Sequence, residues 1–314
     1  MQFRKLGKTD MEVPVIGMGT WAIGGDGFWG PQDRENSIRS LRAGIETGKV
    51  LIDTAPCYGR GEAEEVVGEA IKGKRDQVFL ATKCGLRIDR PRMDKLLTRE
   101  SIFWEVDESL RRLQTDYIDL YQCHWPDLFG TPQEETATAM YDLQKAGKIR
   151  AIGVSNYSVE QMTEFAKYAP LVSLQPQYSL LERELERDQL PYLIENGMGV
   201  LSYGSLGSGL LSGKYNHSNK PDDGRVRFYK YWQEPRFTRA LALIEVLREI
   251  AGARNVSVGN IAIAWTVSNP WMSCALVGGR TPEQVQDNLA AGDIVLTQEE
   301  KDKIEAAYKI YDQE

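Results

Sequence analysis

The sequence predicts an α/β protein that closes into a (β/α)8 TIM barrel, with a β-hairpin before the barrel and extra helices near the C-terminus. Short apolar runs rich in β-branched residues alternate with amphipathic stretches along the chain, as expected for repeated βα units. The length of 314 residues suits one such barrel. Polar residues at the ends of the runs occur all along the chain, whereas an open doubly wound sheet gathers them at one switch point. The barrel is therefore preferred over the open sheet.

The predicted elements follow one another without a linker, repeat or low-complexity tract, so residues 1–314 are taken as a single domain. Residues 3–13 predict a hairpin that plugs one end of the barrel. The eight strands are predicted to end near Gly17, Asp53, Lys83, His124, Ser155, Gln175, Tyr203 and Val277. Helices are predicted over 33–47, 61–73, 100–113, 132–147, 158–168, 187–196, 238–253, 258–268, 281–291 and 298–309.

Some predicted boundaries have a local cause. Thr131-Pro132 and Thr281-Pro282 each place a capping hydroxyl before a proline at the first helical position. Gly147 and Gly197 suit the left-handed backbone that ends a helix. The segment 204–236 is rich in Gly, Asn, Pro and Asp, which predicts a mobile loop.

Composition excludes several classes of function. The net charge of −7 argues against binding to nucleic acids or anionic membranes, because both favour a basic face. The chain begins without the apolar core of a signal peptide and has no apolar run long enough to span a membrane, which predicts a cytoplasmic protein. Two histidines and no H-E-x-x-H motif argue against a catalytic metal. A monomer and a homo-oligomer are both open.

Three successive strand ends carry ionisable side chains, namely Asp53 with the nearby Tyr58, Lys83 and His124. Strand ends at one rim of a barrel lie close in space. A phenol has an ordinary pKa of about 10, and an adjacent Lys83 ammonium would lower the pKa of Tyr58. Burial disfavours an ammonium, and the Asp53 carboxylate would keep it charged. A neutral His124 could orient a carbonyl oxygen or share the proton relay. The four residues therefore predict a general acid beside a polarised carbonyl.

Cysteines adjoin three of these residues, at Cys57, Cys84 and Cys123. One interpretation is a redox switch at the site. The other is that they are small buried residues whose side chains alternate to the opposite side of the strand. The four cysteines, with Cys274, show no C-x-x-C spacing, so neither a structural zinc site nor a disulfide framework is indicated.

Several motifs together resemble the aldo-keto reductase family over the whole chain. They are Gly17-Met18-Gly19-Thr20-Trp21, Asp53-Thr54-Ala55 with Tyr58-Gly59, Lys83, His124-Trp125, Gly153-Val154-Ser155-Asn156, Gln175-Pro176-Gln177-Tyr178 and Gly278-Gly279-Arg280-Thr281-Pro282-Glu283-Gln284. The resemblance implies reversible reduction of an aldehyde or ketone, such as a sugar or a small carbonyl compound, by hydride transfer from a nicotinamide. It also implies that Tyr58 is the acid, that Lys83 and Asp53 tune it, and that His124 orients the substrate.

The resemblance further implies where the cofactor binds. Ser155, Asn156 and Gln175 would hydrogen-bond the nicotinamide carboxamide, and Tyr203 would stack on the ring. The loop 204–214 would pass over the pyrophosphate. Arg280 would meet a 2′-phosphate, and Gln284 with Asn288 would hold the adenosine. Because Arg280 carries this argument, NADP(H) is expected and NAD is the alternative. The full set is Gly19, Thr20, Trp21, Asp53, Ser155, Asn156, Gln175, Tyr203, Gly204, Ser205, Leu206, Ser208, Gly209, Lys214, Gly279, Arg280, Thr281, Gln284 and Asn288.

Aromatic residues after the predicted strands are expected to wall a substrate pocket for an apolar carbonyl or the face of a sugar. They are Trp21, Phe28, Trp29, Trp125, Tyr229 and Trp232. For Trp29 and Trp232, packing of a loop onto the barrel rim is an equally good interpretation.

Two other functions compete with the reductase. One is an NADP-binding regulatory or sensor protein with slow turnover, because the Ser-Asn and Pro-Glu-Gln segments also resemble potassium-channel β subunits. The other is a Schiff-base aldolase that uses Lys83. The presence of Tyr58 and Asp53 beside Lys83 favours the reductase over the aldolase.

Overall fold

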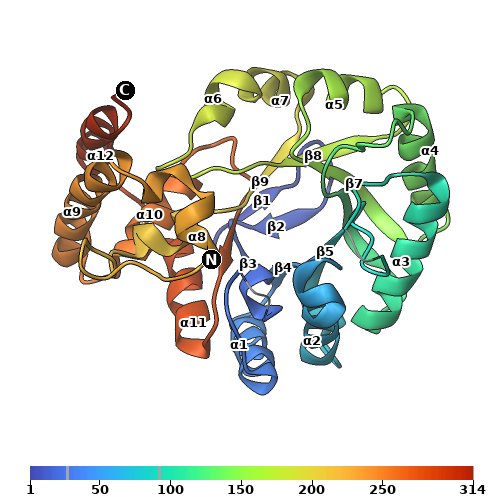
Figure 1. The fold of residues 1–314 in the computed structure, drawn as a ribbon, viewed down its shortest axis with the longest axis horizontal. Helices are drawn as coiled ribbons and strands as arrows, with labels where there is room; N and C mark the ends of the chain where they lie inside the picture. Colours follow the sequence, from blue (N-terminus) through green and yellow to red (C-terminus); the bar gives the residue numbers. More distant parts are fainter. Residues whose placement is uncertain (26–27, 91–92, 314) are drawn as a thin grey trace.

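The computed structural model describes residues 1–25, 28–90 and 93–313. Parallel strands close into a barrel in the order β10-β3-β4-β5-β6-β7-β8-β9 (Figure 1). These strands are β3 (Ile16–Gly19), β4 (Val50–Asp53), β5 (Val78–Cys84), β6 (Ile118–Cys123), β7 (Ile149–Ser155), β8 (Leu171–Gln175), β9 (Gly199–Ser202) and β10 (Cys274–Gly278). Because β10 pairs with both β3 and β9, the sheet has no open edge. The predicted barrel is confirmed, and the open sheet is wrong.

Helices surround the barrel (Figure 1). They are α1 (Arg34–Ile45), α2 (Glu62–Ala70), α3 (Arg99–Leu113), α4 (Gln133–Lys145), α5 (Val159–Phe165), α6 (Glu184–Asp188), α7 (Leu190–Asn196), α8 (Gly224–Phe228), α9 (Arg236–Arg254), α10 (Val258–Val267), α11 (Pro282–Ala290) and α12 (Gln298–Tyr311). The predicted helices are confirmed to within three residues, except that 187–196 falls partly in α6 and partly in α7. Pro191 stands in the first turn of α7, where a missing N–H costs least.

One local prediction needs correction. Pro132, not Thr131, occupies the N-cap position of α4, so the Thr131 hydroxyl does not cap that helix. The segment 204–236 contains α8 and the 3₁₀ turns η4 (Gly207–Ser212) and η5 (Lys230–Trp232), and its mobility stays a prediction. By contrast, Thr281 caps α11 as predicted, and its side chain accepts a hydrogen bond from the Gln284 N–H.

The hairpin β1 (Phe3–Lys5) and β2 (Glu12–Pro14) lies across the middle of the barrel in Figure 1. Leu6 and Val13 form one apolar cluster with the interior residues Leu51, Ala81, Leu120, Ala151, Leu201, Cys274 and Leu276. This packing confirms that the hairpin plugs the barrel. At Gly17 a Cβ atom would lie 2.8 Å from Leu51 Cδ2 and 2.9 Å from Leu276 Cδ2, so any larger residue would force these interior side chains to shift.

Side chains along a strand alternate between the interior and the exterior of the barrel. The inward positions above the apolar layer are therefore Asp53, Lys83, Gln122, Ser155 and Gln175. The outward positions pack against the helices in a separate and larger apolar cluster. Within the described ranges, none of the helices combines the length and apolarity needed to cross a membrane.

Candidate active site

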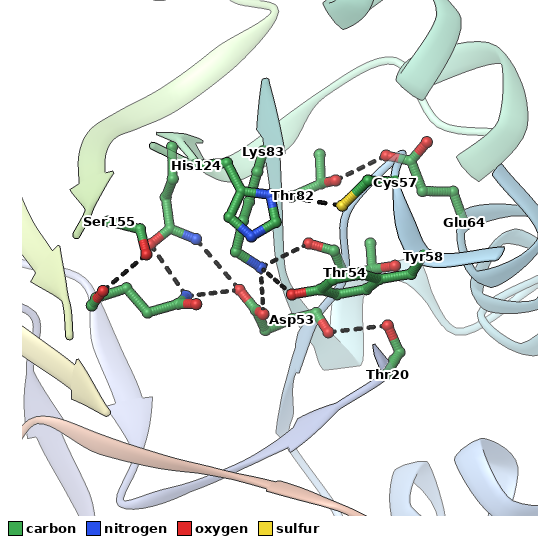
Figure 2. Close-up of polar contacts among 12 residues, drawn as sticks. Thr20, Asp53, Thr54, Cys57, Tyr58, Glu64, Thr82, Lys83, His124 and Ser155 are labelled. Carbon is green, nitrogen blue, oxygen red and sulfur yellow. Dashed lines mark hydrogen bonds and ion pairs between the residues drawn. The ribbon is translucent and has the colours of Figure 1, made fainter. Parts of the chain in front are cut away.

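Lys83 on β5 is the centre of a hydrogen-bond network at the carboxyl end of the barrel strands (Figure 2). Its Nζ donates to Asp53 Oδ1 at 2.5 Å, to the Thr54 carbonyl at 2.9 Å and to the Tyr58 hydroxyl at 3.3 Å. Lys83 and Asp53 are both buried, so little water screens their charges. Three of the predicted catalytic residues are thus in direct contact.

Two glutamine amides hold the other oxygen of Asp53. Gln175 Nε2 donates to Asp53 Oδ2 at 2.9 Å, and Gln122 Nε2 donates to the same oxygen at 3.2 Å. Gln122 is not among the site residues that the sequence predicts. The available signal is its position two residues before His124, which places it on the inward face of β6. These bonds fix the carboxylate and, through it, Lys83.

Burial raises the pKa of Tyr58 well above 10, and the Asp53 carboxylate raises it further. The predicted lowering of this pKa is therefore wrong. The Lys83 ammonium is 3.3 Å from the phenol but only 2.5 Å from the Asp53 carboxylate, so the phenol meets a compensated pair and not a free cation. At neutral pH Tyr58 is a protonated phenol next to an ammonium.

The imidazole of His124 stands edge-on to Tyr58, with 5.8 Å between ring centroids and 84° between ring planes. Burial lowers the pKa of His124 well below 6.5, and the charges of Lys83 and Lys95 lower it further. The imidazole is therefore neutral, in agreement with the prediction. It could receive or donate one hydrogen bond toward a group held beside the Tyr58 hydroxyl.

The four residues predicted to meet a nicotinamide lie in one network at the ends of β7, β8 and β9. Ser155 Oγ donates to the Gln175 carbonyl at 2.7 Å, and Asn156 Nδ2 donates to Ser155 Oγ at 3.0 Å. Tyr203 OH donates to Asn156 Oδ1 at 2.9 Å. Asn156 has a left-handed backbone with a φ of 62°, which asparagine tolerates better than most residues. The bonds tie these side chains together at the rim.

A cleft of about 550 Å³ opens beside this network, within the range typical of small-molecule sites. Tyr58 and His124 line it, together with ten of the predicted cofactor residues. These ten are Gly19, Thr20, Trp21, Asp53, Ser155, Asn156, Gln175, Tyr203, Gly204 and Ser208. The structure therefore brings most of the predicted catalytic and nicotinamide residues to one cavity.

Two glycines give the cleft a wall without side chains. Gly19 on β3 and Gly278 on β10 are register partners and both line the cleft. A Cβ atom at Gly19 would have no neighbour closer than 3.9 Å, and one at Gly278 none closer than 3.7 Å. Such atoms would project into open space, so the glycines keep room for a ligand. The open wall and the polar rim leave room for a ligand beside the predicted nicotinamide residues.

The residues predicted for the adenosine end lie outside the cleft. The guanidinium of Arg280 donates to Gln32 Oε1 at 2.7 Å and to the carbonyls of Trp29 and Pro31 at 3.2 and 2.5 Å. Gln284 Oε1 accepts from the Arg280 N–H at 2.9 Å. Arg280 thus holds the loop between β3 and α1 against the start of α11. Gly279, Thr281 and Asn288 are likewise not part of the cleft wall; Asn288 Nδ2 donates to the Gly278 carbonyl at 3.1 Å.

The predicted pyrophosphate loop is only partly exposed to the cleft. Gly204 and Ser208 line it, whereas Ser205, Leu206, Gly209 and Lys214 do not. Ser205 is buried, and its Oγ donates to the Leu276 carbonyl at 3.1 Å. Its side chain therefore connects the loop to β10 and does not face the cleft.

Four of the predicted aromatic residues wall the cleft, namely Trp21, Phe28, Trp125 and Tyr229, and Phe228 joins them. Trp29 stands behind Trp21, with 5.5 Å between ring centroids in an edge-on arrangement. Trp232 is buried and stacks on Phe237 of α9 at 5.6 Å. The expectation that Trp29 and Trp232 form the pocket wall needs correction, because both pack loops onto the barrel.

The cysteines divide into two groups. Cys84 and Cys123 are buried in the outer apolar cluster, as the second interpretation expects. Cys57 is half-buried, lines the cleft and lies beside His124, so it is not merely a buried filler. All four cysteines are free, and burial raises the pKa of Cys57 to about 12. A thiol with so high a pKa is a poor nucleophile and a poor redox sensor.

A closed barrel whose rim brings a phenol, an ammonium and an imidazole together beside a cleft defines a class, that of the barrel oxidoreductases. Among the residues that the structure describes, no group of three or more His, Cys, Asp or Glu is arranged to hold a metal ion. Residues 15–309 match the family model described as Aldo/keto reductase family, and the chain belongs to that family.

Relatives of known name cover nearly the whole chain. "Aldo-keto reductase YhdN" of Bacillus subtilis is 48% identical over 291 residues, which are 91% of this chain and 87% of that protein. "NADH-specific methylglyoxal reductase" of Escherichia coli is 36% identical over 93% of this chain and 94% of its own length. A "Probable voltage-gated potassium channel subunit beta" of Arabidopsis thaliana is 32% identical over 97% of this chain and 96% of its own. Both predicted resemblances are confirmed.

Solved structures of family members superpose on nearly the whole chain. The glycerol dehydrogenase AKR11B4 from Gluconobacter oxydans superposes with a TM-score of 0.88 at 38% identity, covering 97% of this chain and 94% of that one. An aldo/keto reductase from Klebsiella pneumoniae, solved in complex with NADP and acetate, gives a TM-score of 0.78 at 32% identity, with 98% and 95% covered.

Proposed function

We propose that this protein reduces an aldehyde or ketone to the alcohol, reversibly, with NADP(H) as cofactor and Tyr58 as the general acid. The contact that carries the proposal is the one of 3.3 Å between Lys83 Nζ and the Tyr58 hydroxyl, at the edge of a cleft. An ammonium fixed next to a phenol stabilises the phenolate that proton donation would leave behind.

The cofactor, when bound, supplies the hydride in reduction and accepts it in oxidation. Tyr58 holds the proton that the developing alkoxide takes, and its raised pKa keeps that proton in place until the alkoxide forms. His124 orients the carbonyl oxygen toward Tyr58. Ser155, Asn156 and Gln175 would hold the carboxamide, and Tyr203 the ring. The aromatic wall of the cleft keeps water away from the reacting carbon.

NADP is favoured by the Klebsiella pneumoniae relatives, whose structures are titled as complexes with NADP or NADPH. The Escherichia coli relative named as NADH-specific keeps NAD as the alternative. Arg280 would have to exchange its bonds to the 29–32 loop for a 2′-phosphate. Comparison of KM for NADPH and NADH decides the choice, and equal values would contradict an NADP preference.

The substrate is proposed to be a small carbonyl compound. Two relatives are named for methylglyoxal and glycerol, both three-carbon compounds. The apolar and aromatic wall formed by Trp21, Phe28 and Trp125 suits the carbon side of such molecules. A panel of small aldehydes, ketones and sugars, followed at the NADPH absorbance band, tests this class.

The Tyr58→Phe variant tests the acid. It is expected to lower kcat by roughly 10²–10⁴ while cofactor affinity stays within a few-fold. Tyr121→Phe is the matched control, because Tyr121 is a buried tyrosine on the outward face of β6 and should keep the wild-type kcat. Wild-type turnover by Tyr58→Phe would remove the assignment.

The alternative is a sensor that binds NADP and turns over slowly, supported by the similarity to channel β subunits. It predicts tight NADPH binding but negligible consumption of NADPH with every carbonyl in the panel. The aldolase alternative has less support, because Lys83 Nζ already donates three hydrogen bonds. Borohydride trapping of a substrate adduct on Lys83 would revive it.

A further inference from the structure

Cys57 touches the imidazole ring of His124. Cys57 Sγ lies 3.6 Å from His124 Nδ1, within reach of a hydrogen bond that involves sulfur. In Figure 2 this contact is on one side of the ring, and the other ring nitrogen is on the side of Lys83 and Tyr58. Among the described residues, Cys57 is the hydrogen-bond partner of the His124 imidazole ring. The side-chain amide of Asn156 donates to the backbone carbonyl of His124 and not to the ring.

Both partners are neutral. Burial raises the pKa of Cys57 to about 12, so the thiol keeps its proton. Burial lowers the pKa of His124 well below 6.5, so the imidazole carries one proton and has one acceptor nitrogen. The pair therefore has two arrangements. Either the thiol donates to Nδ1 and the ring proton is on Nε2, or Nδ1–H donates to sulfur and Nε2 has the lone pair.

Two arguments favour the first arrangement. A neutral imidazole nitrogen is a good acceptor, whereas a thiol sulfur is a weak one. In addition, the nitrogen on the side of Tyr58 must donate a hydrogen bond if it is to hold a carbonyl oxygen there. A lone pair at that position would repel the oxygen, and the negative charge that develops on it would make the repulsion stronger.

We propose that Cys57 is a positioning residue, whose thiol donates to His124 Nδ1 and thereby keeps the ring proton on Nε2, where it faces the substrate carbonyl oxygen. The thiol also fixes the rotation of the ring. This inference rests on the proposed function, because carbonyl reduction is what requires a donor at Nε2. It assigns to Cys57 a part in orienting the substrate and no covalent or redox step.

The tautomer can be measured without turnover. The chain has two histidines, His124 and His217, so ¹⁵N-histidine labelling of the full chain gives two ring systems, and His217→Asn assigns them. Long-range ¹H–¹⁵N correlation near pH 7.5 should show His124 protonated on Nε2 with an unprotonated Nδ1. Cys57→Ala should shift the signals toward the Nδ1–H form or an average of both, and Cys57→Ser should restore the wild-type pattern, because a hydroxyl also donates.

Kinetics supply the second readout. Cys57→Ala should lower kcat for carbonyl reduction about fivefold, the effect of one lost hydrogen bond, while KM for NADPH is unchanged and Cys57→Ser recovers the rate. Cys123→Ala is the matched control. It removes a thiol next to His124 in sequence that faces the outer cluster, so the tautomer should stay as in the wild type.

A wild-type ring protonated on Nδ1, or a Cys57→Ala ring with the wild-type pattern, would overturn the inference. If Cys57→Ala fails to fold, the wild-type and Cys57→Ser spectra still decide. A different measurement would show that the proposed function is wrong. In that case Tyr58→Phe would turn over like the wild type, whatever the tautomer of His124.

Discussion

Strand β5 has a buried ion pair on each of its faces. On the inward face Lys83 pairs with Asp53 at 2.5 Å. On the outward face the neighbouring Thr82 donates to Glu64 of α2, which pairs with Arg112 of α3 at 2.7 Å. All these side chains are buried. The two pairs differ in where their remaining hydrogen bonds go.

The outward pair is enclosed by the protein. Thr82 Oγ1 donates to Glu64 Oε1, Arg112 Nε donates to Glu64 Oε2, and Arg112 Nη1 reaches Glu108 at 3.3 Å. The Glu64–Arg112 pair, with Thr82, thus connects α2 and α3 to β5. The inward pair passes a hydrogen bond from Lys83 to Tyr58, which lines a cleft. A buried ion pair alone therefore does not indicate a functional site. A buried ion pair that also hydrogen-bonds a side chain lining a cleft, as Lys83 does with Tyr58, does indicate one.

The largest expected effect is that of Lys83→Met. It removes the cation beside Tyr58 and leaves the Asp53 carboxylate buried without its cation, with only the amides of Gln122 and Gln175 as partners. We expect kcat to fall about 10³-fold and the free energy of unfolding to fall by about 3–5 kcal/mol. Single-turnover kinetics and denaturant unfolding measure the two effects.

The double variant Asp53→Asn/Lys83→Met separates them. It removes both charges, so part of the stability should return while kcat stays low. A single Lys83→Met variant that keeps wild-type kcat would show that the inward pair is structural, like the outward one.

The next effect concerns stability alone. Arg112→Leu leaves Glu64 buried without its cation, and the free energy of unfolding should fall by about 3–5 kcal/mol, while kcat of the folded fraction stays within about threefold, since no contact of Tyr58 changes. Glu64→Gln combined with Arg112→Leu should regain much of the loss. A tenfold fall in kcat for Arg112→Leu would instead mean that loss of the outward pair changes the position of Lys83 through its neighbour Thr82.

The fold and the residues at strand ends could be predicted because both depend on short-range pattern. Asp53, Lys83 and His124 each follow an apolar run, and the geometry of a barrel brings such positions to one rim. Strand alternation would also have indicated Gln122, since it shares the inward face with His124.

The partners of long side chains could not be predicted in this way. Arg280 has five donors on a flexible stem, and the sequence does not say that the carbonyls of Trp29 and Pro31 will approach it. Trp232 and Trp125 are alike in sequence terms, yet one stacks on Phe237 and the other lines the cleft. The direction of the Tyr58 pKa shift depends first on the burial of its hydroxyl and then on the nearby Asp53 carboxylate, and only the folded chain defines both.

The smallest expected effect is a pH dependence of stability from a third buried acid, Glu105 of α3. Its carboxylate accepts hydrogen bonds from Ser101 Oγ and the Gly85 N–H, both at 3.0 Å. Within the described residues it has no ion-pair partner. Burial raises the pKa of Glu105 from 4.5 to about 7, against the opposing effects of these hydrogen bonds and of the Arg87 charge. Glu105 thus shows how a buried acid behaves when no cation is in direct contact with it.

The sign follows from the direction of the shift. The folded-state pKa lies above the unfolded one, so the folded chain binds more protons between pH 4.5 and 7 and stability falls as pH rises through that window. The loss should reach about 3 kcal/mol above pH 7. Denaturant unfolding of the wild type and Glu105→Gln at pH 5 and pH 7.5 measures it, and the variant should lack this part of the slope. Glu108→Gln on the same helix is the control, because a hydrogen bond from Arg111 lowers the pKa of Glu108 and places its titration below the window. Equal slopes for the wild type and Glu105→Gln would show that hydrogen bonds and the more distant charge of Arg87 suffice to keep a buried carboxylate charged. The cation in direct contact with the acid in each of the two pairs would then have to be explained by something other than burial.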